Sequence, residues 1–147
     1  HYPLRRQRQM CIRDRCKMLL NRSGKNPLNS VNCIVSKIEF LEMQSEVQNV
    51  FVSDDMARYI VSLISATRKH PLLSRGASPR ATLSLTDMAK AVAFAEGRDY
   101  IVPRDVQNIF ICTVNHRIIL NAKASASKKN SEEILHEILR KTPKPRT

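Results

Sequence analysis

One helix start in this chain combines residue types suited to binding an anion. Ser78 and Pro79 are followed by Arg80, and no Asp or Glu lies in the turn that they open. The first turn of a helix carries unpaired amides and a partial positive charge, and an arginine adds a planar fork of donors that fits a phosphate. A cation at this end of the dipole costs ~0.3–1 kcal/mol when nothing offsets it. Two interpretations stay open at this point: Arg80 binds an anion, or its side chain points into water.

The elements that must position this turn are helices. The chain has 147 residues, 42% of them hydrophobic, with only three glycines and no tryptophan, which favours helices over a turn-rich β fold. Apolar residues at helical spacing predict helices that begin at Lys37, Asp54, Pro79, Pro103 and Ser131. Four of these five helices place an acid in the first turn, and the helix that begins at Pro79 is the exception.

Local signals predict where these helices begin and end, and which residues lie between them. A loop is expected at residues 70–77, a short extended piece at 100–102, an extended segment or a last helical turn at 116–120, and a polar linker at residues 121–130. The residues expected to start or stop helices are Ser36 with Glu39, Ser53, Pro71, Ser78 with Pro79, Gly97, Pro103 with Asp105, and Ser131 with Glu132 and Glu133.

The apolar faces predict one core shared by the first four helices. Its expected members are Ile60, Leu63, Ile64, Leu85, Met88, Val92, Val106 and Ile109. The fold class that follows is all-α, a small bundle of four to five helices, with room for a minor pairing of two extended segments.

The net charge of +12 is concentrated in part at the start of the chain. Residues 1–15 hold five arginines against one acid, so the remainder carries 20 basic and 12 acidic residues, or +8. Residues 10–15 read as the translation of a transposase-adapter sequence used in short-read library preparation, and we interpret residues 1–15 as non-native. A nucleic-acid-binding arm is the functional alternative. No apolar run follows the arginines, so a signal peptide is not expected.

The four cysteines, Cys11, Cys16, Cys33 and Cys112, show no CxxC pairing. Unlinked thiols in a reducing cytoplasm are therefore expected rather than a metal site. No apolar run approaches the ~20 residues that cross a bilayer. A cytoplasmic protein with no bound metal and no membrane span is the resulting prediction.

Four motifs in register resemble the MoxR family of AAA+ ATPases. Residues 76–81, Gly-Ala-Ser-Pro-Arg-Ala, resemble the family's sensor-2 motif. Ala66-Thr67-Arg68 lies upstream, residues 96–100 (Glu-Gly-Arg-Asp-Tyr) lie downstream, and residues 116–120 (His-Arg-Ile-Ile-Leu) close the domain. The likeness covers about residues 16–140. One departure is Val102 before Pro103, where the family usually has a capping threonine, which is expected to weaken that helix by ~1 kcal/mol.

The resemblance implies a lid that packs over ATP held by a separate α/β domain. Arg80 would contact the γ-phosphate as the sensor-2 arginine, and the cofactor-binding residues would be Gly76, Ala77, Ser78, Pro79 and Arg80. Mg²⁺ would be held by that other domain, because no GxxxxGK[ST] loop occurs here and this chain alone should not hydrolyse ATP. The family implies a homo-hexamer and partners with von Willebrand A domains, with no nucleic acid bound.

The resulting division is residues 1–15 non-native, 16–35 a connector from the missing ATPase core, 36–120 the lid, and 121–147 a linker with a C-terminal helix. Two other functions stay open on the residues alone: a basic helical nucleic-acid-binding module, or a protein-interaction bundle without a ligand. His116 and Arg117 carry two interpretations as well, a nucleotide or subunit contact, or a structural hydrogen bond to the neighbouring loop.

Overall fold

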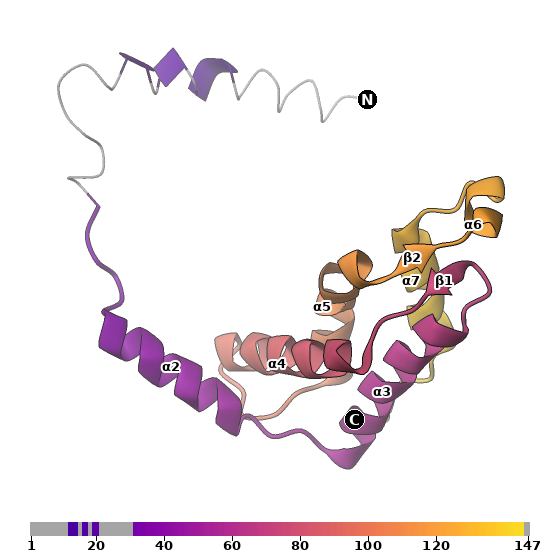
Figure 1. The fold of residues 1–147 in the computed structure, drawn as a ribbon. Helices are drawn as coiled ribbons and strands as arrows, with labels where there is room; N and C mark the ends of the chain where they lie inside the picture. The colour runs from indigo at the N-terminus through magenta and orange to yellow at the C-terminus, as the bar shows by residue number, and fades with distance from the viewer. Residues whose placement is uncertain (1–11, 15, 18, 21–30, 146–147) are drawn as a thin grey trace. The chain divides into compact units, whose positions relative to one another are not determined.

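The computed structural model describes residues 12–14, 16–17, 19–20 and 31–145. The chain divides into two compact units, His1–Glu39 and Phe40–Thr147. Most of the segment interpreted as non-native, residues 1–15, lies outside the described residues, as does much of the expected connector. The elements along the chain are α2 (Lys37–Asn49), α3 (Asp54–Lys69), β1 (Leu73–Arg75), α4 (Pro79–Ala95), α5 (Pro103–Val114), the 3₁₀ turn η2 (Asn115–Arg117), β2 (Ile119–Leu120), α6 (Ala122–Ala126) and α7 (Ser131–Lys141) (Figure 1).

The predicted fold class is confirmed: the described part of the chain is mostly helical, with a two-stranded sheet. Helix α3 shows how local signals set an element. Ser53 Oγ accepts a hydrogen bond from the amide of Met56 at 3.3 Å, so the expected cap is formed. His70, before Pro71, is already extended and ends the helix. One face of this helix is buried, including the predicted core residues Ile60, Leu63 and Ile64; its other buried members are Met56, Tyr59 and Thr67.

The core lies where α4 and α5 pack against each other, with α3 and α7 contributing further buried residues (Figure 1). The buried positions of α4 recur every four residues, and three of the four are alanines, so α5 approaches closely: Ala81, Leu85, Ala89 and Ala93. The stripe is therefore narrow. Met88 falls outside it and is 47% exposed, so its predicted place in the core is wrong. Val92 and Ile109 are only partly buried, whereas the other five predicted members are buried.

Helix α2 does not join this core, and that prediction is also wrong. None of its residues is buried. Its apolar residues Phe40, Leu41 and Met43 are 54%, 52% and 41% exposed, so they do not pack into the core that α3, α4, α5 and α7 share. The expected capping box is formed, with Glu39 N–H donating to Ser36 Oγ at 3.2 Å and Ser36 N–H to Glu39 Oε2 at 2.7 Å.

Helix α7 contributes more than the sequence suggested. Ile134, Leu135 and Ile138 are buried in the same core as α3 and α5. The N-cap is Asn130 rather than Ser131, because Asn130 Oδ1 accepts from the amide of Glu133 at 2.8 Å while Glu133 Oε2 accepts from Asn130 N–H at 3.0 Å. The polar linker thus connects two parts of one core.

The segments expected to be irregular contain a small sheet and a short helix. Strands β1 and β2 are antiparallel, with Leu73 opposite Leu120 and Arg75 opposite Ile119. The expected loop at residues 70–77 therefore includes a strand. Helix α6 lies within the expected linker and begins where Asn121 Oδ1 accepts from the amide of Ala124 at 3.1 Å.

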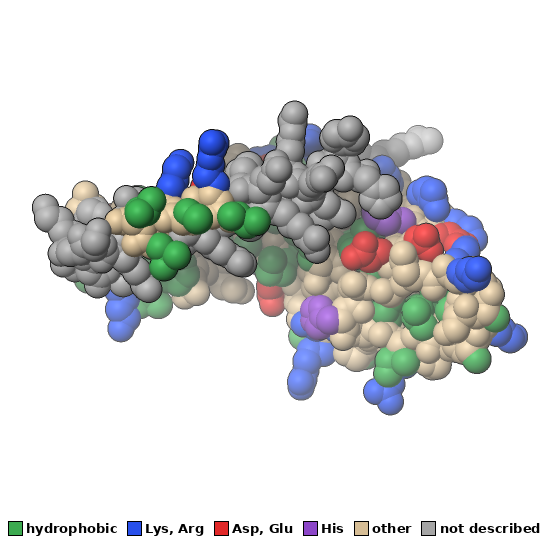
Figure 2. All heavy atoms as spheres, turned by 90° about the horizontal axis from the view of Figure 1, so that it is seen from above, with side chains coloured by type: hydrophobic (Ala, Val, Ile, Leu, Met, Phe, Trp, Pro, Cys, Tyr) green, Lys and Arg blue, Asp and Glu red, His purple; other side chains and the backbone are tan. Residues whose placement is uncertain are grey.

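Charged side chains in this unit fall into paired and unpaired sets. Glu137 accepts hydrogen bonds from Lys129 Nζ at 2.8 Å and Lys141 Nζ at 2.6 Å, and these contacts lower its pKa to about 2. Other Lys and Arg side chains project into solvent, and Figure 2 shows several of them around the right-hand edge of the Phe40–Thr147 unit.

Candidate functional site

A buried threonine joins the end of α3 to the segment before α4. Thr67 is fully buried, donates through Oγ1 to the carbonyl of Ile64 at 2.6 Å, and accepts from the amide of Ala77 at 3.0 Å. Both hydrogen-bonding capacities of the hydroxyl are used inside the core, where an unpaired amide would be costly. Two of the motifs that carry the family resemblance, residues 66–68 and 76–81, are therefore in direct contact.

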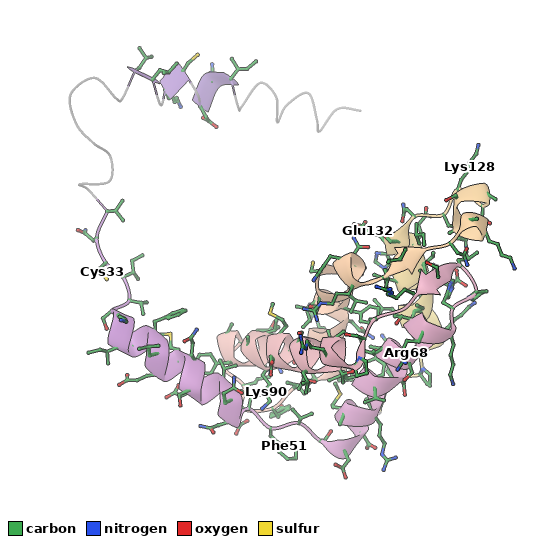
Figure 3. The ribbon with its side chains drawn as sticks, in the orientation of Figure 1. Cys33, Phe51, Arg68, Lys90, Lys128 and Glu132 are labelled. Atoms are coloured by element: carbon green, nitrogen blue, oxygen red, sulfur yellow. The ribbon has the colours of Figure 1, made fainter. Side chains whose placement is uncertain are left out.

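Gly76 allows this contact because it has no side chain. A Cβ placed at Gly76 would lie 2.5 Å from both Cα and N of Arg68, closer than real Cβ atoms come to backbone. The loop before α4 thus lies directly on the last turn of α3, where Figure 3 labels Arg68. This glycine is required for close approach rather than for an unusual φ angle.

The residues of the predicted sensor-2 segment divide into an inner and an outer set. Ala77 is fully buried, and Gly76 is half-buried against α3. Ser78, Pro79 and Arg80 are exposed at the start of α4. Among the residues that the structure describes, the Arg80 side chain has no hydrogen-bond or ion-pair partner. The inner set anchors the turn, and the outer set is what a ligand could reach.

The cap at this helix start differs from the sequence prediction. Ser78 occupies the N-cap position, but its hydroxyl makes no capping hydrogen bond; the carbonyl of Ser78 accepts from Ala81 N–H at 2.8 Å instead. Helix α4 has no acid in its first turn, in contrast to α2, α3, α5 and α7. The short helix α6 also has no acid in its first turn, but the sequence predicted a linker there and so did not include it in the comparison. The first turn of α4 therefore has neither an acidic residue nor a side-chain cap at its positive end.

The motif at residues 116–120 packs against the same helix one turn later. Arg117 Nη1 donates to Ser84 Oγ at 3.1 Å, and Ser84 Oγ donates to the carbonyl of Arg80 at 3.4 Å. Arg117 Nε also donates to His116 Nε2 at 3.1 Å. The structural hydrogen bond anticipated for this pair is present, but it goes to α4 rather than to the neighbouring loop.

The motif at residues 96–100 joins α4 to α5 through an ion pair. Arg98 donates to both carboxylate oxygens of Asp105, at 2.9 and 2.7 Å, and to Glu96 Oε2 at 2.6 Å. These hydrogen bonds raise the pKa of Arg98, so its charge is permanent. Asp105 is buried, and its Oδ2 also accepts from Val102 N–H at 2.8 Å. Since valine has no side-chain acceptor, only this half of the helix cap is made, as the missing threonine predicted.

The sequence predicted Asp105 only as a residue that starts a helix and did not predict its ion pair with Arg98. Gly97, which ends α4 as predicted, has φ +73° and turns the chain so that Arg98 faces α5. Within the described residues, no group of three or more His, Cys, Asp or Glu could hold a metal ion. Nor does that part of the chain contain a helix long and apolar enough to cross a membrane.

Comparison with known proteins identifies this arrangement. The sequence profile of the AAA lid domain family matches residues 65–138, which include the Thr67–Ala77 contact, Arg80 and the Arg98–Asp105 pair. The chain belongs to that family. Its relatives place it in the MoxR group of AAA+ proteins, as the four motifs indicated, and family membership favours the lid over a nucleic-acid-binding module.

Two curated relatives match most of this lid. The uncharacterized protein YeaC of Bacillus subtilis is 35% identical over 114 residues, covering 78% of this chain and 36% of the relative. Chaperone MoxR1 of Mycobacterium tuberculosis is 30% identical over 136 residues, covering 86% of this chain and 36% of the relative. A crystal structure of a candidate ATPase from Cytophaga hutchinsonii has TM-score 0.79 and 34% identity, covering 90% of this chain and 43% of that one. The chain thus spans about a third of the length of these curated relatives.

Proposed function

We propose that this lid closes over ATP in a MoxR-type AAA+ ATPase and senses the γ-phosphate through Arg80. The observation that carries the proposal is the position of Arg80: exposed, without a partner in the described chain, and in the first turn of a helix that lacks an acid. Such a turn favours an anion, and a guanidinium there adds charge-assisted donors. A contact that strengthens as charge develops on the transferred phosphoryl group lowers the barrier to hydrolysis.

The remaining residues of the segment act by positioning in this proposal. Ser78 and Pro79 border the phosphate beside Arg80. Gly76 and Ala77 hold the turn against α3, through the close approach to Arg68 and the hydrogen bond to Thr67. We therefore assign Gly76 and Ala77 to the support of the site, although the resemblance grouped them with the cofactor-binding residues.

The rest of the proposed activity belongs to the longer protein. Its α/β domain would hold Mg²⁺ and the catalytic groups, and the lid would contribute Arg80 to the nucleotide bound there. The relative named as a chaperone supports a role in acting on other proteins. We propose a cytoplasmic homo-hexamer whose clients include proteins with von Willebrand A domains.

The test is the substitution Arg80→Ala in the full-length ATPase, with Arg80→Lys and Arg58→Ala as matched variants. Arg58 is an exposed arginine of α3 without a partner in the described chain, so it controls for loss of a surface charge. Turnover should fall at least several-fold in Arg80→Ala, partly recover in Arg80→Lys, and stay unchanged in Arg58→Ala.

Melting of the 147-residue chain supplies the second readout. Removing a cation from the positive end of α4 should leave the melting temperature unchanged or raise it slightly, because the dipole penalty disappears. Loss of stability together with normal turnover in Arg80→Ala would show that Arg80 is structural and that the proposal is wrong.

A further inference from the structure

Four unpaired cations of the Phe40–Thr147 unit lie on the segments around the β1–β2 pairing and on α6 with its following turn. Lys69 ends α3, Arg75 ends β1, and Lys123 and Lys128 belong to α6 and the turn that follows it. All four are exposed, and none has a side-chain hydrogen bond or ion pair with any residue that the structure describes. We call these four residues the basic end surface.

The tertiary structure assembles this surface from two stretches without acidic residues. Residues 56–86 and 106–131 contain no Asp or Glu. The β1–β2 pairing brings the two stretches together, and Asn121 reinforces it by donating from Nδ2 to the carbonyl of Pro71 at 2.8 Å and from its amide to that of Leu72 at 3.1 Å. Glu137, the acid that faces His70 at the end of α3, is already bound by Lys129 and Lys141.

One of the four cations occupies a backbone position that disfavours lysine. Lys128 has φ +53°, in the left-handed region. It closes α6 in the position where glycine is usual, with its amide bonded to the carbonyl of Ser125 at 3.1 Å and the amide of Lys129 bonded to Ala124 O at 3.2 Å. A side chain in this conformation carries a steric penalty that glycine avoids. Lys128 is exposed, and Figure 3 shows it projecting outward from the turn after α6. Backbone strain at an exposed residue suggests that the lysine has a functional role, which here would be its positive charge.

The surroundings of these cations indicate the chemistry of what they bind. Ile119, opposite Arg75 in the sheet, is 51% exposed, so an apolar side chain lies beside the charges. The exposed aromatic residues of the described chain, Phe40, Phe51 and Tyr100, belong instead to α2 and to the bridge between Phe51 and Tyr100. The unpaired bases of a single strand would have no aromatic side chain to stack on here, and the phosphates of a duplex would contact the cations but not Ile119. A protein segment with carboxylates and apolar side chains could pair with the cations and also cover Ile119.

We propose that the basic end surface docks a carboxylate-rich segment of a partner protein, with an apolar side chain of that segment covering Ile119. The basic end surface does not include Arg80, and the proposal does not depend on the nucleotide-sensing function. Its cations supply charge complementarity and faster encounter, and Ile119 supplies a small apolar contact.

Binding is measured with a labelled peptide of alternating glutamate and leucine, titrated with the 147-residue chain. Affinity should fall several-fold between about 50 and 200 mM salt. Lys123→Gln and Arg75→Gln should each weaken binding by about threefold to tenfold. Arg58→Gln removes an exposed cation of α3 that is not part of the basic end surface. It should change the peptide affinity by less than about twofold.

Lys128 gives the sharpest test, because the two effects of Lys128→Gly have opposite signs. The melting temperature should rise by about 2–5 °C as the left-handed strain is relieved. Peptide affinity should fall as in Lys123→Gln. Lys128→Arg, which keeps both the charge and the strain, should keep wild-type affinity and wild-type stability.

Three outcomes would overturn the proposal. One is equal affinity for a matched glutamine–leucine peptide, which would remove the need for charge. Another is tighter binding of a DNA strand or duplex with the same total charge as the glutamate–leucine peptide. If Lys123→Gln, Arg75→Gln and Lys128→Gly abolished that DNA binding, the surface would be assigned to nucleic acid. The third is unchanged peptide binding in Lys123→Gln, Arg75→Gln and Lys128→Gly.

Discussion

The hydroxyl of Thr67 accepts a hydrogen bond from the amide of Ala77 at 3.0 Å, ten residues further along the chain. The same hydroxyl donates to the carbonyl of Ile64, so the last turn of α3 fixes the backbone three residues before Arg80. A side chain proposed to meet a phosphate needs such support, because an arginine on an unanchored loop would lose entropy on every contact.

Thr67→Val tests this support. Valine fills the same volume without the hydroxyl, so the buried amide of Ala77 loses its acceptor, at an expected cost of ~1–3 kcal/mol. The free energy of unfolding is measured by urea denaturation. Thr86→Val is the control, since Thr86 bonds only to the carbonyl of Thr82 within α4 and should change stability by about 0.5 kcal/mol or less. Equal losses in the two variants would mean that the Ala77 contact contributes nothing of its own.

Gly76→Ala should destabilise the lid by about 2–4 kcal/mol, because the new Cβ collides with the backbone of Arg68 and the backbone cannot move aside cheaply. Gly97→Ala is the comparison. Nothing lies within 4 Å of a Cβ there, but the residue has φ +73°, so strain alone should cost ~1–2 kcal/mol. Urea denaturation of both variants ranks the two costs, and the reverse order would contradict the close approach at Gly76.

Leu63→Ala should cost ~2–5 kcal/mol, because Leu63 is fully buried between the helices. Met88→Ala should cost less than about 1 kcal/mol, since nearly half of that side chain is in solvent. Thermal and urea unfolding measure both. A loss below half a kcal/mol for Leu63→Ala would mean that this face of α3 is assigned wrongly.

Acid should weaken the lid partly through Glu137. Hydrogen bonds from Lys129 and Lys141 lower its pKa in the folded state to about 2, below the ordinary 4.5. As the pH falls, the Glu137 carboxylate is therefore protonated in the unfolded chain before it is protonated in the folded one. Its contribution to the free energy of unfolding is complete above pH 4.5 and is lost as the pH falls towards 2. Melting temperatures of the wild type and Glu137→Gln should differ at pH 6 and converge near pH 2. A constant difference across that range would show that the charge of Glu137 does not contribute.

The sequence by itself determined the five longer helices and most of their ends, because those signals act within a few residues. Ser53 and Pro71 around α3, and Gly97 after α4, work through hydrogen bonds and φ angles that no distant segment needs to supply. The unusual start of α4 was visible for the same reason, since a dipole and the charge beside it belong to one turn. The motifs predicted the family, but not what most of their residues do.

Only the tertiary structure decided how those motifs act on one another. Thr67 and Gly76 read as ordinary helix and loop residues until α3 and the segment before α4 are in contact. Leu85 and Met88 have similar apolar side chains three residues apart, yet the close approach of α5 buries one and leaves the other in solvent. The pairing of β1 with β2 likewise depends on segments more than 40 residues apart. Such contacts depend on which surfaces meet, and chain spacing does not record that.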